Sequence, residues 1–425
     1  MSIFSRRFFI GAAAATLCSV GLTEANAAEE LTLRVSAAPS IVADMYEAMA
    51  RAFEAKHPKI KIDIDTSQRD YNAQVDATLR DSLTGQLADV SIQGNNKIRL
   101  YVDRGLAVPL DDYLSVELKS DETTLSPSVA SIGEVGGKVY GLGLSVSAPV
   151  IFYNLDLVKK VDVDPSGLPT TWDGILELAR KINDPASGTL GAYFTYDQAD
   201  WFWIALIESQ GGRMMTPDEK KVAFDGAQGL KAMQLLKAFG EAGQAEVDMP
   251  RDQVRQLFAA GKIAILADSS GSLGGFEKQS EEKFAIATRK FPLLSESARL
   301  PAGGGLGIVF AKDPERQKAA WEFLKFAAGA DGQKIIAEKS SYLVANSRVA
   351  TDPAMLGEFY RNKPNMKAAI EELPILNSWY SFPGQNSGKI INTLIDRMRS
   401  VITLKAEPEA ALKATVQDIQ ALLPN

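Results

Sequence analysis

The feature that most constrains the fold is a strand, helix and strand pattern between residues 31 and 64. Apolar and polar side chains alternate from Leu31 to Val35, as in a half-buried strand. Apolar residues then recur four positions apart between Met45 and Phe53, which is one face of a helix. Pro58 ends that helix before a second alternating segment, Ile60 to Ile64. Such a unit requires parallel strands and a right-handed crossover, so we predict an α/β fold.

Length and charge limit the remaining possibilities. The chain has 425 residues, of which 46% are hydrophobic and 23% charged, a composition typical of globular proteins. This length favours about two or three domains, each large enough to bury its own core. The formal charge of -7 offers no basic surface for a phosphate backbone, so we expect no nucleic-acid partner.

The first 27 residues are predicted to be a signal peptide. Arg6-Arg7 precede an apolar stretch from Phe8 to Leu22, and Ala25-Asn26-Ala27 provides small residues for cleavage after Ala27. The paired arginines resemble a twin-arginine signal, and an ordinary Sec leader is the alternative. No later apolar run reaches the length of a membrane helix, so we expect a soluble protein exported to the periplasm.

Two residue types that carry much enzyme chemistry are almost absent. Cys18 is the only cysteine and lies in the predicted signal peptide, and His57 is the only histidine. Thiol proteases and His-rich zinc sites are therefore excluded. The glycines at 303–305 and 307 fit neither the Rossmann nor the Walker spacing, and they indicate either a hinge or a turn close to a ligand. We predict no catalytic residues, no cofactor and no metal.

Helix boundaries are readable at several later points. Thr171 is a candidate N-cap for a helix with an apolar face through Ile182. Asp313-Pro314-Glu315 combines an N-cap acid, a proline in the first turn and a second acid. An amphipathic helix is predicted from Glu407 to near the end of the chain.

The aromatic residues of 193–203 suggest the chemistry of the ligand. Tyr193-Phe194-Thr195-Tyr196 and Trp201-Phe202-Trp203 flank polar residues that include Asp197 and Gln198. An aromatic face packs against the C–H side of a sugar while neighbouring polar groups bind its hydroxyls. The other interpretation is that these rings fill a core at the start of a helix.

A set of short motifs, in order along the chain, resembles family 1 of the extracellular solute-binding proteins of ABC importers. The motifs are APVIFYNLD (148–156), PTTWD (169–173), FAAGKIAILA (258–267), GGG (303–305) and AWEFLK (320–325), together with Phe53–Pro58 and the strand after it. The resemblance implies a monomer with two α/β lobes that crossing segments join and a ligand cleft between them. We expect residues 28–147 with 303–340 to form the N-terminal lobe, and residues 148–302 with 341–425 to form the C-terminal lobe.

Within that family the chain resembles the glycerol-3-phosphate-binding branch, through Ser269-Ser270-Gly271-Ser272 and Ser341-Tyr342-Leu343. The ligand-binding residues that this resemblance implies are Tyr71, Gln93, Ser147, Trp201, Ser270, Gly304 and Tyr342. The chain departs from the pattern of this branch at two positions. The resemblance implies a glutamate at the position of Gln93 and another tryptophan at the position of Gln198. Around residues 381–390 only Lys389 could replace the arginine expected near a phosphate.

We therefore expect a neutral sugar or polyol, captured by lobe closure and delivered to a membrane permease. The alternatives are glycerol-3-phosphate or a related glycerophosphate, a glycoside hydrolase that uses the same kind of cleft, and a sensor adaptor.

Overall fold

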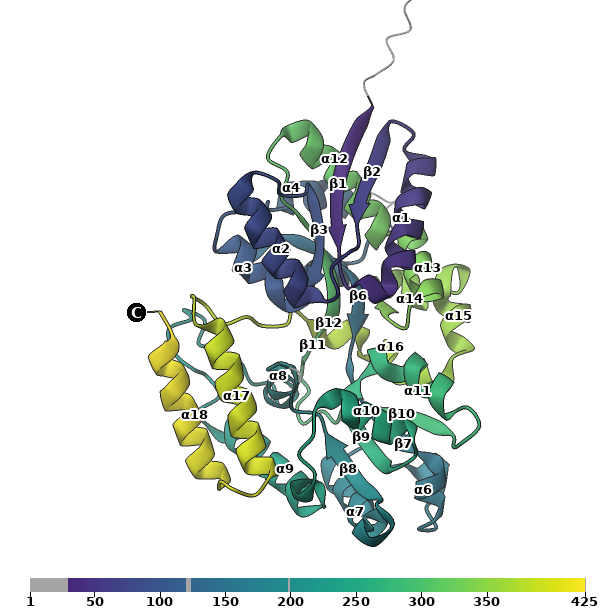
Figure 1. Ribbon diagram of the computed structural model, residues 1–425, viewed down its shortest axis with the longest axis vertical. Helices are drawn as coiled ribbons and strands as arrows, with labels where there is room; N and C mark the ends of the chain where they lie inside the picture. The colour runs from purple at the N-terminus through teal and green to yellow at the C-terminus, as the bar shows by residue number, and fades with distance from the viewer. Residues whose placement is uncertain (1–29, 120–123, 198, 425) are drawn as a thin grey trace, which may run out of the picture.

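The computed structural model describes residues 30–119, 124–197 and 199–424. The predicted signal peptide, with Cys18, and the departure at Gln198 lie outside the described residues. The described residues form two α/β lobes, one above the other in Figure 1, which confirms the predicted two-lobed periplasmic-binding-protein fold.

A six-stranded sheet forms the N-terminal lobe. Its strands lie in the order β13 (Leu343–Val344), β6 (Gly141–Ser147), β12 (Gly303–Val309), β3 (Val90–Gly94), β1 (Leu31–Ala37) and β2 (Ile60–Asp65). β1 pairs in parallel with β2 and β3, as the strand, helix and strand pattern predicts. β12 is antiparallel to both of its neighbours, and it reaches this sheet from the other lobe. A central strand is thus supplied by residues far along the chain.

Helices cover this sheet. They are α1 (Ala43–Lys56), α2 (Tyr71–Thr84), α3 (Ile98–Val102), α4 (Asp111–Glu117), α5 (Pro127–Ser131), α12 (Pro314–Ala328), α13 (Ala330–Lys339) and α14 (Ser347–Thr351). The start of α12 is as predicted: Asp313 accepts hydrogen bonds from the backbone N–H groups of Glu315 and Arg316, and Pro314 follows it. These caps satisfy N–H groups that the helix itself leaves free.

A four-stranded sheet forms the C-terminal lobe, in the order β10 (Ile286–Lys290), β7 (Pro149–Asn154), β9 (Ile263–Ser269) and β8 (Leu190–Phe194). The helices of this lobe include α6 (Leu155–Lys159), α7 (Trp172–Ile182), α8 (Trp201–Glu208), α9 (Ala227–Glu241), α10 (Arg251–Ala259), α11 (Leu273–Ser280) and α16 (Lys367–Glu372). Thr171 caps α7 through a hydrogen bond from Gly174 N, as predicted. Every residue of α8 is buried, so this helix has no polar face.

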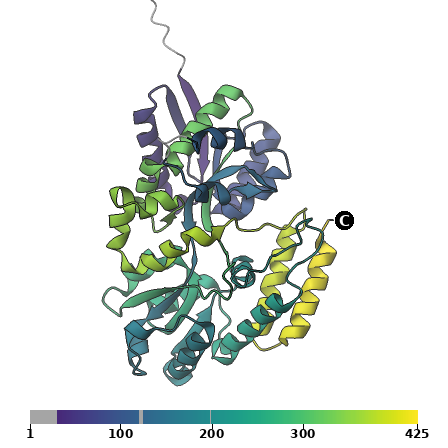
Figure 2. The same ribbon diagram turned by 180° about the vertical axis from the view of Figure 1, so that it is seen from behind.

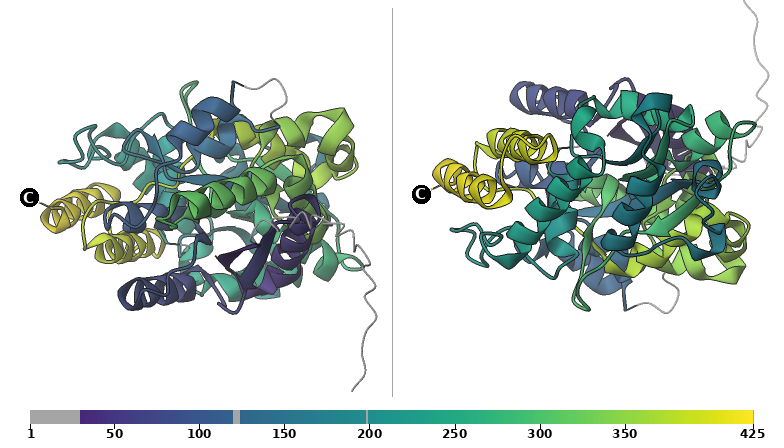
Figure 3. Two further views of the ribbon diagram at one scale, coloured as in Figure 1. Left: turned by 90° about the horizontal axis from the view of Figure 1, so that it is seen from above. Right: turned by 90° about the horizontal axis from the view of Figure 1, so that it is seen from below.

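The last two helices, α17 (Ser387–Ile402) and α18 (Pro408–Leu422), pack on each other and on α9. They stand to one side of the C-terminal lobe in Figure 2, and the views along the long axis in Figure 3 show the same pair beside the body of the molecule. α18 begins directly after Glu407, as the amphipathic pattern predicts. No helix among the described residues combines the length and apolar character needed to cross a membrane.

The chain passes between the lobes at several points. β6 runs through Ala148 into β7, and β11 (Leu300–Pro301) runs through Ala302 into β12. The chain crosses between the lobes a third time between α14 and α16. After this crossing, β14 (Leu376–Asn377) pairs with β11. The sequence assigned residues 341–425 to the C-terminal lobe, but β13 falls in that range and pairs with β6 of the N-terminal sheet. The sequence could not predict this strand, because β13 has only two residues and an alternating pattern cannot be recognised over so short a segment.

Candidate ligand-binding site

A cleft of about 870 Å³ lies between the lobes. This volume falls within the range typical of small-molecule sites. Its walls come from the starts of α2 and α10, the ends of β6 and β9, and the first residues of β12. The site is therefore formed where strands and helix N-termini of both lobes converge.

Four of the seven residues predicted to bind ligand line this cleft. Tyr71 is the first residue of α2, and Ser147 is the last residue of β6. Gly304 and Tyr342 lie on the same wall. Gly304 has a φ of 108°, and a Cβ there would lie 2.2 Å from the carbonyl oxygen of Ser145. Only glycine fits this position, because other residues strongly disfavour that backbone angle and the space is closed.

The other three predicted residues lie behind the cleft wall. Gln93 is 0% exposed, and its Nε2 donates to Thr78 Oγ1 at 3.0 Å and to Ser91 Oγ at 2.8 Å. Ser270 Oγ accepts a 2.9 Å hydrogen bond from Ala148 N, and its own N–H donates to Ala148 O. Ser270 therefore fixes the crossing between β6 and β7. Direct contact of ligand with Gln93 or Ser270 stays a prediction.

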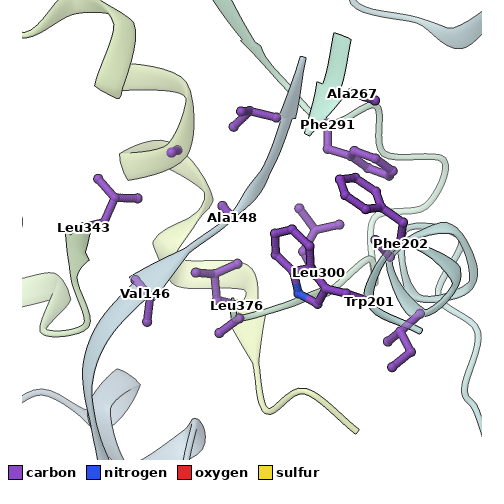
Figure 4. Packing of buried hydrophobic residues seen from close by; sticks show 14 of the residues in the cluster. Val146, Ala148, Trp201, Phe202, Ala267, Phe291, Leu300, Leu343 and Leu376 are labelled. Atoms are coloured by element: carbon purple, nitrogen blue, oxygen red, sulfur yellow. The ribbon is translucent and has the colours of Figure 1, made fainter. Parts of the chain in front are cut away.

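Trp201 is also packed in the core, at 0% exposure. Figure 4 shows its ring among Leu300, Leu376 and Phe202. Its Nε1 donates to Pro301 O at 2.8 Å, which ties α8 to the second crossing. A stacking role for this ring would require the cleft to reach it, so that role also remains a prediction.

The tryptophan that lines the cleft is Trp379, which the sequence analysis did not select. Its ring centroid lies 5.9 Å from that of Trp201, and its Nε1 donates to Asp200 Oδ1 at 2.8 Å. Burial raises the pKa of Asp200 to about 6, against the opposing effect of this hydrogen bond. The sequence did contain a signal for this residue. Trp379 and Tyr380 are adjacent aromatic residues on the segment that connects β14 to α17, and residues on connecting segments often take part in binding.

Charged side chains of both signs line the cleft. Lys97 comes from the N-terminal lobe, and Arg251 and Arg255 come from α10. Arg255 is neutralised by the fully buried Asp268, with N–O distances of 2.7 and 2.9 Å. Burial lowers the pKa of Lys97, while Asp200 and Asp70 act in the opposite direction. The sequence analysis missed these cations because it looked for one only at residues 381–390.

Several buried polar atoms at the cleft have no hydrogen-bond partner among the described residues. They are Ser272 Oγ, Asp197 Oδ1 and Arg251 Nε. Burial raises the pKa of Tyr71 well above its usual value, and Tyr342 raises it further, so this hydroxyl keeps its proton. Buried polar groups in folded proteins are almost always paired, with other protein groups or with ordered water, so these atoms are unusual among the residues that line the cleft.

The described residues hold no cluster of three His, Cys, Asp or Glu side chains arranged to bind a metal ion. His57 stacks on Phe53 with ring centroids 4.2 Å apart, away from the cleft lining. The polar groups among the residues that line the cleft are hydroxyls, carboxylates, amides, cations and the indole of Trp379, and apolar side chains such as Ile41 and Phe276 lie beside them. Such groups bind a polar solute through hydrogen bonds and ring contact.

The family of bacterial extracellular solute-binding proteins matches residues 38–334, which span most of both lobes. The chain belongs to this family. Among the relatives of this solute-binding protein, one from Brucella abortus (strain 2308), named simply as a binding protein, is 26% identical over 417 residues, covering 96% of this chain and 97% of the relative. The sn-glycerol-3-phosphate-binding periplasmic protein UgpB of Escherichia coli (strain K12) is 23% identical over 395 residues, 89% of each chain.

Solved structures share the fold of this solute-binding protein. The sugar-binding protein MalE from Xanthomonas citri has a TM-score of 0.77 at 17% identity, covering 92% of this chain and 97% of its own. UgpB from Mycobacterium tuberculosis in complex with glycerophosphocholine has a TM-score of 0.76 at 17% identity, covering 91% of this chain and 97% of its own. These likenesses establish the two-lobed architecture.

Proposed function

We propose that this protein is the substrate-binding component of an ABC importer and captures a sugar or polyol in the cleft between its lobes. The observation that carries the proposal is the cleft of about 870 Å³ between the lobes, which hydroxyl groups, charged side chains and the partly buried Trp379 line. The solute leaves unaltered and passes to a membrane permease. Membership in the solute-binding family supports binding as the function, in preference to glycoside hydrolysis.

Capture depends on contacts that both lobes supply. Tyr71 and Lys97 face the cleft from the N-terminal lobe, and Arg251 and Ser272 face it from the C-terminal lobe. A solute that touches both walls binds best when the lobes are closed, so it shifts the equilibrium toward that state. A micromolar Kd corresponds to about -8 kcal/mol, which a few desolvated hydrogen bonds and one ring contact supply after the costs of ordering.

The balance of charges in the cleft supports a neutral solute. Asp268 neutralises Arg255. The Oδ2 atom of Asp70 lies 3.0 Å from Nε of Arg69, and the same carboxylate caps the N-terminus of α2. The second candidate is glycerol-3-phosphate or a related glycerophosphate. Lys97 favours it, because this partly buried cation lines the cleft and has no ion pair within the described residues. The name of the Escherichia coli relative favours the same class.

The proposal includes export and assembly. A signal peptide cleaved after Ala27 would deliver the chain to the periplasm, by the twin-arginine or the Sec route. The protein would act there as a monomer, and a role as a sensor adaptor would use the same cleft. Deletion of the gene separates these roles, because a transport component is required for solute uptake and a sensor only for the response.

A thermal-shift screen against sugars, polyols and glycerophosphates tests the function. A solute that binds only the folded state raises the melting temperature by mass action. Calorimetry on the hit should give one saturable binding event, and chromatography should recover the solute unchanged. Steady release of a hydrolysis product would instead establish an enzyme, and the absence of any hit among all three classes would refute the proposal.

A further inference from the structure

Trp379, Tyr380 and Ser381 form a short segment between β14 and α17, which we call the strap. All three residues are half-buried. The backbone N–H and C=O groups of the strap form no hydrogen bond within the part of the chain that the structure describes. Since backbone hydrogen bonds normally fix a segment in place, the strap depends on its side chains for its position.

Two carboxylates of the C-terminal lobe accept hydrogen bonds from the strap. Trp379 Nε1 donates to Asp200 Oδ1 at 2.8 Å, directly before α8. Tyr380 Oη donates to Glu219 Oε1 at 3.0 Å. Hydrogen bonds to charged acceptors are stronger than those between neutral groups. Asp200 is 1% exposed, so water competes little for its carboxylate.

The strap is also attached to the N-terminal lobe. Ser381 Oγ donates to the backbone oxygen of Asn96 at 2.8 Å. Glu219 accepts two further hydrogen bonds from the guanidinium of Arg99 on α3, at 2.5 and 2.7 Å. The N-terminal lobe therefore reaches the strap twice, once directly and once through Glu219.

The backbone of Glu219 is strained. Its φ of 54° lies in the left-handed region, which residues other than glycine rarely adopt. Two bonds brace the turn that contains it: Glu219 N donates to Thr216 O at 2.8 Å, and Gln420 Nε2 of α18 donates to Lys220 O at 2.7 Å. Such strain persists only where the surrounding structure fixes it, and it is frequent at functional positions. The turn therefore presents the Glu219 carboxylate to Tyr380 in one fixed place.

Trp379 is the residue of the strap that lines the cleft. A tryptophan side chain turns about two bonds, and its one polar atom, Nε1, selects among the orientations when it has a fixed acceptor. Asp200 is that acceptor. Glu219 acts one residue later, because it holds Tyr380 and with it the backbone from which the indole projects. The two carboxylates thus control the same ring from two points.

We propose that Asp200 and Glu219 are positioning residues that hold the indole of Trp379 in the cleft wall, Asp200 directly and Glu219 through Tyr380. Because Arg99 holds Glu219, the contact between the lobes also reaches the ring. The inference rests on the proposed function, since the ring matters for binding only if the cleft is the solute site. It assigns a role to side chains that lie outside the cleft lining.

Fluorine NMR of the solute-free protein tests the positioning without any ligand. The full exported chain is labelled with 5-fluorotryptophan, which gives one resonance for each of its five tryptophans. Trp379→Phe identifies the resonance of Trp379 by its disappearance. In Tyr380→Phe, which removes a single oxygen atom, and in Glu219→Ala, that resonance should shift by more than its own linewidth, because the ring meets new surroundings.

Matched variants separate positioning from a general loss of structure. Asp200→Ala should displace the same resonance, and Asp200→Asn, which keeps an oxygen acceptor for Nε1, should return it toward its original place. Tyr153→Phe is the control, because it removes a hydroxyl that donates to Pro169 O at 2.7 Å within the C-terminal lobe, and it should leave the Trp379 resonance unmoved. Circular dichroism melting establishes that each variant is folded, and Tyr380→Phe decides the question if Asp200→Ala is not.

A thermodynamic cycle tests whether the positioning acts on binding through the ring. Calorimetry with sn-glycerol-3-phosphate and with maltose measures the effect of Tyr380→Phe in the unmodified chain and in Trp379→Ala. In the unmodified chain the bound probe should be weakened roughly 3- to 10-fold, in line with the loss of one hydrogen bond. In Trp379→Ala the same change should have no further effect, because residues that act through one another are not additive.

The possible failures are distinct. An unmoved Trp379 resonance in Tyr380→Phe and Glu219→Ala refutes the positioning, as does a shift of equal size in Tyr153→Phe. Equal weakening by Tyr380→Phe with and without Trp379 refutes the route through the ring. If no solute of the three screened classes binds, the proposed function fails, while the resonances still establish or refute the placement of the indole.

Discussion

Arg99 and Glu219 join the two lobes beside the cleft, and their removal gives a sharp test of how the lobes are coupled. Arg99 lies on α3 of the N-terminal lobe, and Glu219 lies in the turn between Met215 and Val222 of the C-terminal lobe. The guanidinium donates two hydrogen bonds to the carboxylate, at 2.5 and 2.7 Å, and Tyr380 Oη donates a third at 3.0 Å. The perturbation is Arg99→Gln, Glu219→Gln and the double variant.

The size of the coupling free energy between Arg99 and Glu219 follows from the geometry of their contact and from how far the two side chains are exposed. Exposed ion pairs contribute about 0.2–1 kcal/mol, whereas hydrogen bonds to charged groups contribute about 1.5–3 kcal/mol when water is largely excluded. The Arg99 side chain is 17% exposed and that of Glu219 is 36% exposed, so this pair lies between the two cases. We expect a coupling of about 1–2 kcal/mol, and 1.4 kcal/mol is a tenfold change in an equilibrium.

The assay is a double-mutant cycle by urea denaturation, together with small-angle X-ray scattering of the solute-free protein. Loss of the contact should enlarge the radius of gyration, because it removes an attraction between the lobes. The Glu177–Lys181 pair, at 2.8 Å within α7 and well exposed, is the matched control and should give about 0.3–0.5 kcal/mol with unchanged scattering. A coupling for Arg99 and Glu219 no larger than this control, or scattering identical to that of the unmodified chain, would refute the reasoning.

Three further predictions concern stability. Trp201→Ala should lower the free energy of unfolding by about 3–5 kcal/mol in urea denaturation, because the ring is fully buried; a value near zero would show that the ring is not packed. Asp313→Ala should cost about 1 kcal/mol through loss of the cap on α12, with an unchanged m-value, and an effect below experimental error would contradict the capping role. Burial raises the pKa of Glu208 from 4.5 to about 8, so its ionisation in the unfolded state should lower stability as pH rises between these values, by at most about 1.4 kcal/mol per unit. Glu208→Gln should flatten this fall in chemical denaturation measured from pH 5 to 8, and an unchanged pH profile would refute the assignment.

The elements that the sequence predicted well carry their own local signals. Asp313-Pro314-Glu315 and Thr171 are capping residues whose effect is confined to one helical turn, so they can be read without knowing what packs against the helix. The segment from Leu31 to Ile64 is similar, because its change of periodicity is a property of consecutive residues.

The site was harder to predict, since exposure depends on contacts distant in sequence. Trp201 and Trp379 are both tryptophans with polar neighbours, yet the first is buried and the second lines the cleft. One clue was available for Trp201: residues 201–208 are apolar on every face apart from Glu208, a pattern typical of a buried helix. No such clue links Trp379 with Asp200, because only the fold brings them together.

The position of β12 has a consequence for how the protein is made. This strand lies between β3 and β6, but the ribosome reaches residues 303–309 only after the whole four-stranded sheet has been synthesised. Until then β3 and β6 lack the partner that separates them, and their unpaired edges are open to aggregation. The N-terminal sheet therefore cannot be completed until residues 303–309 have been synthesised.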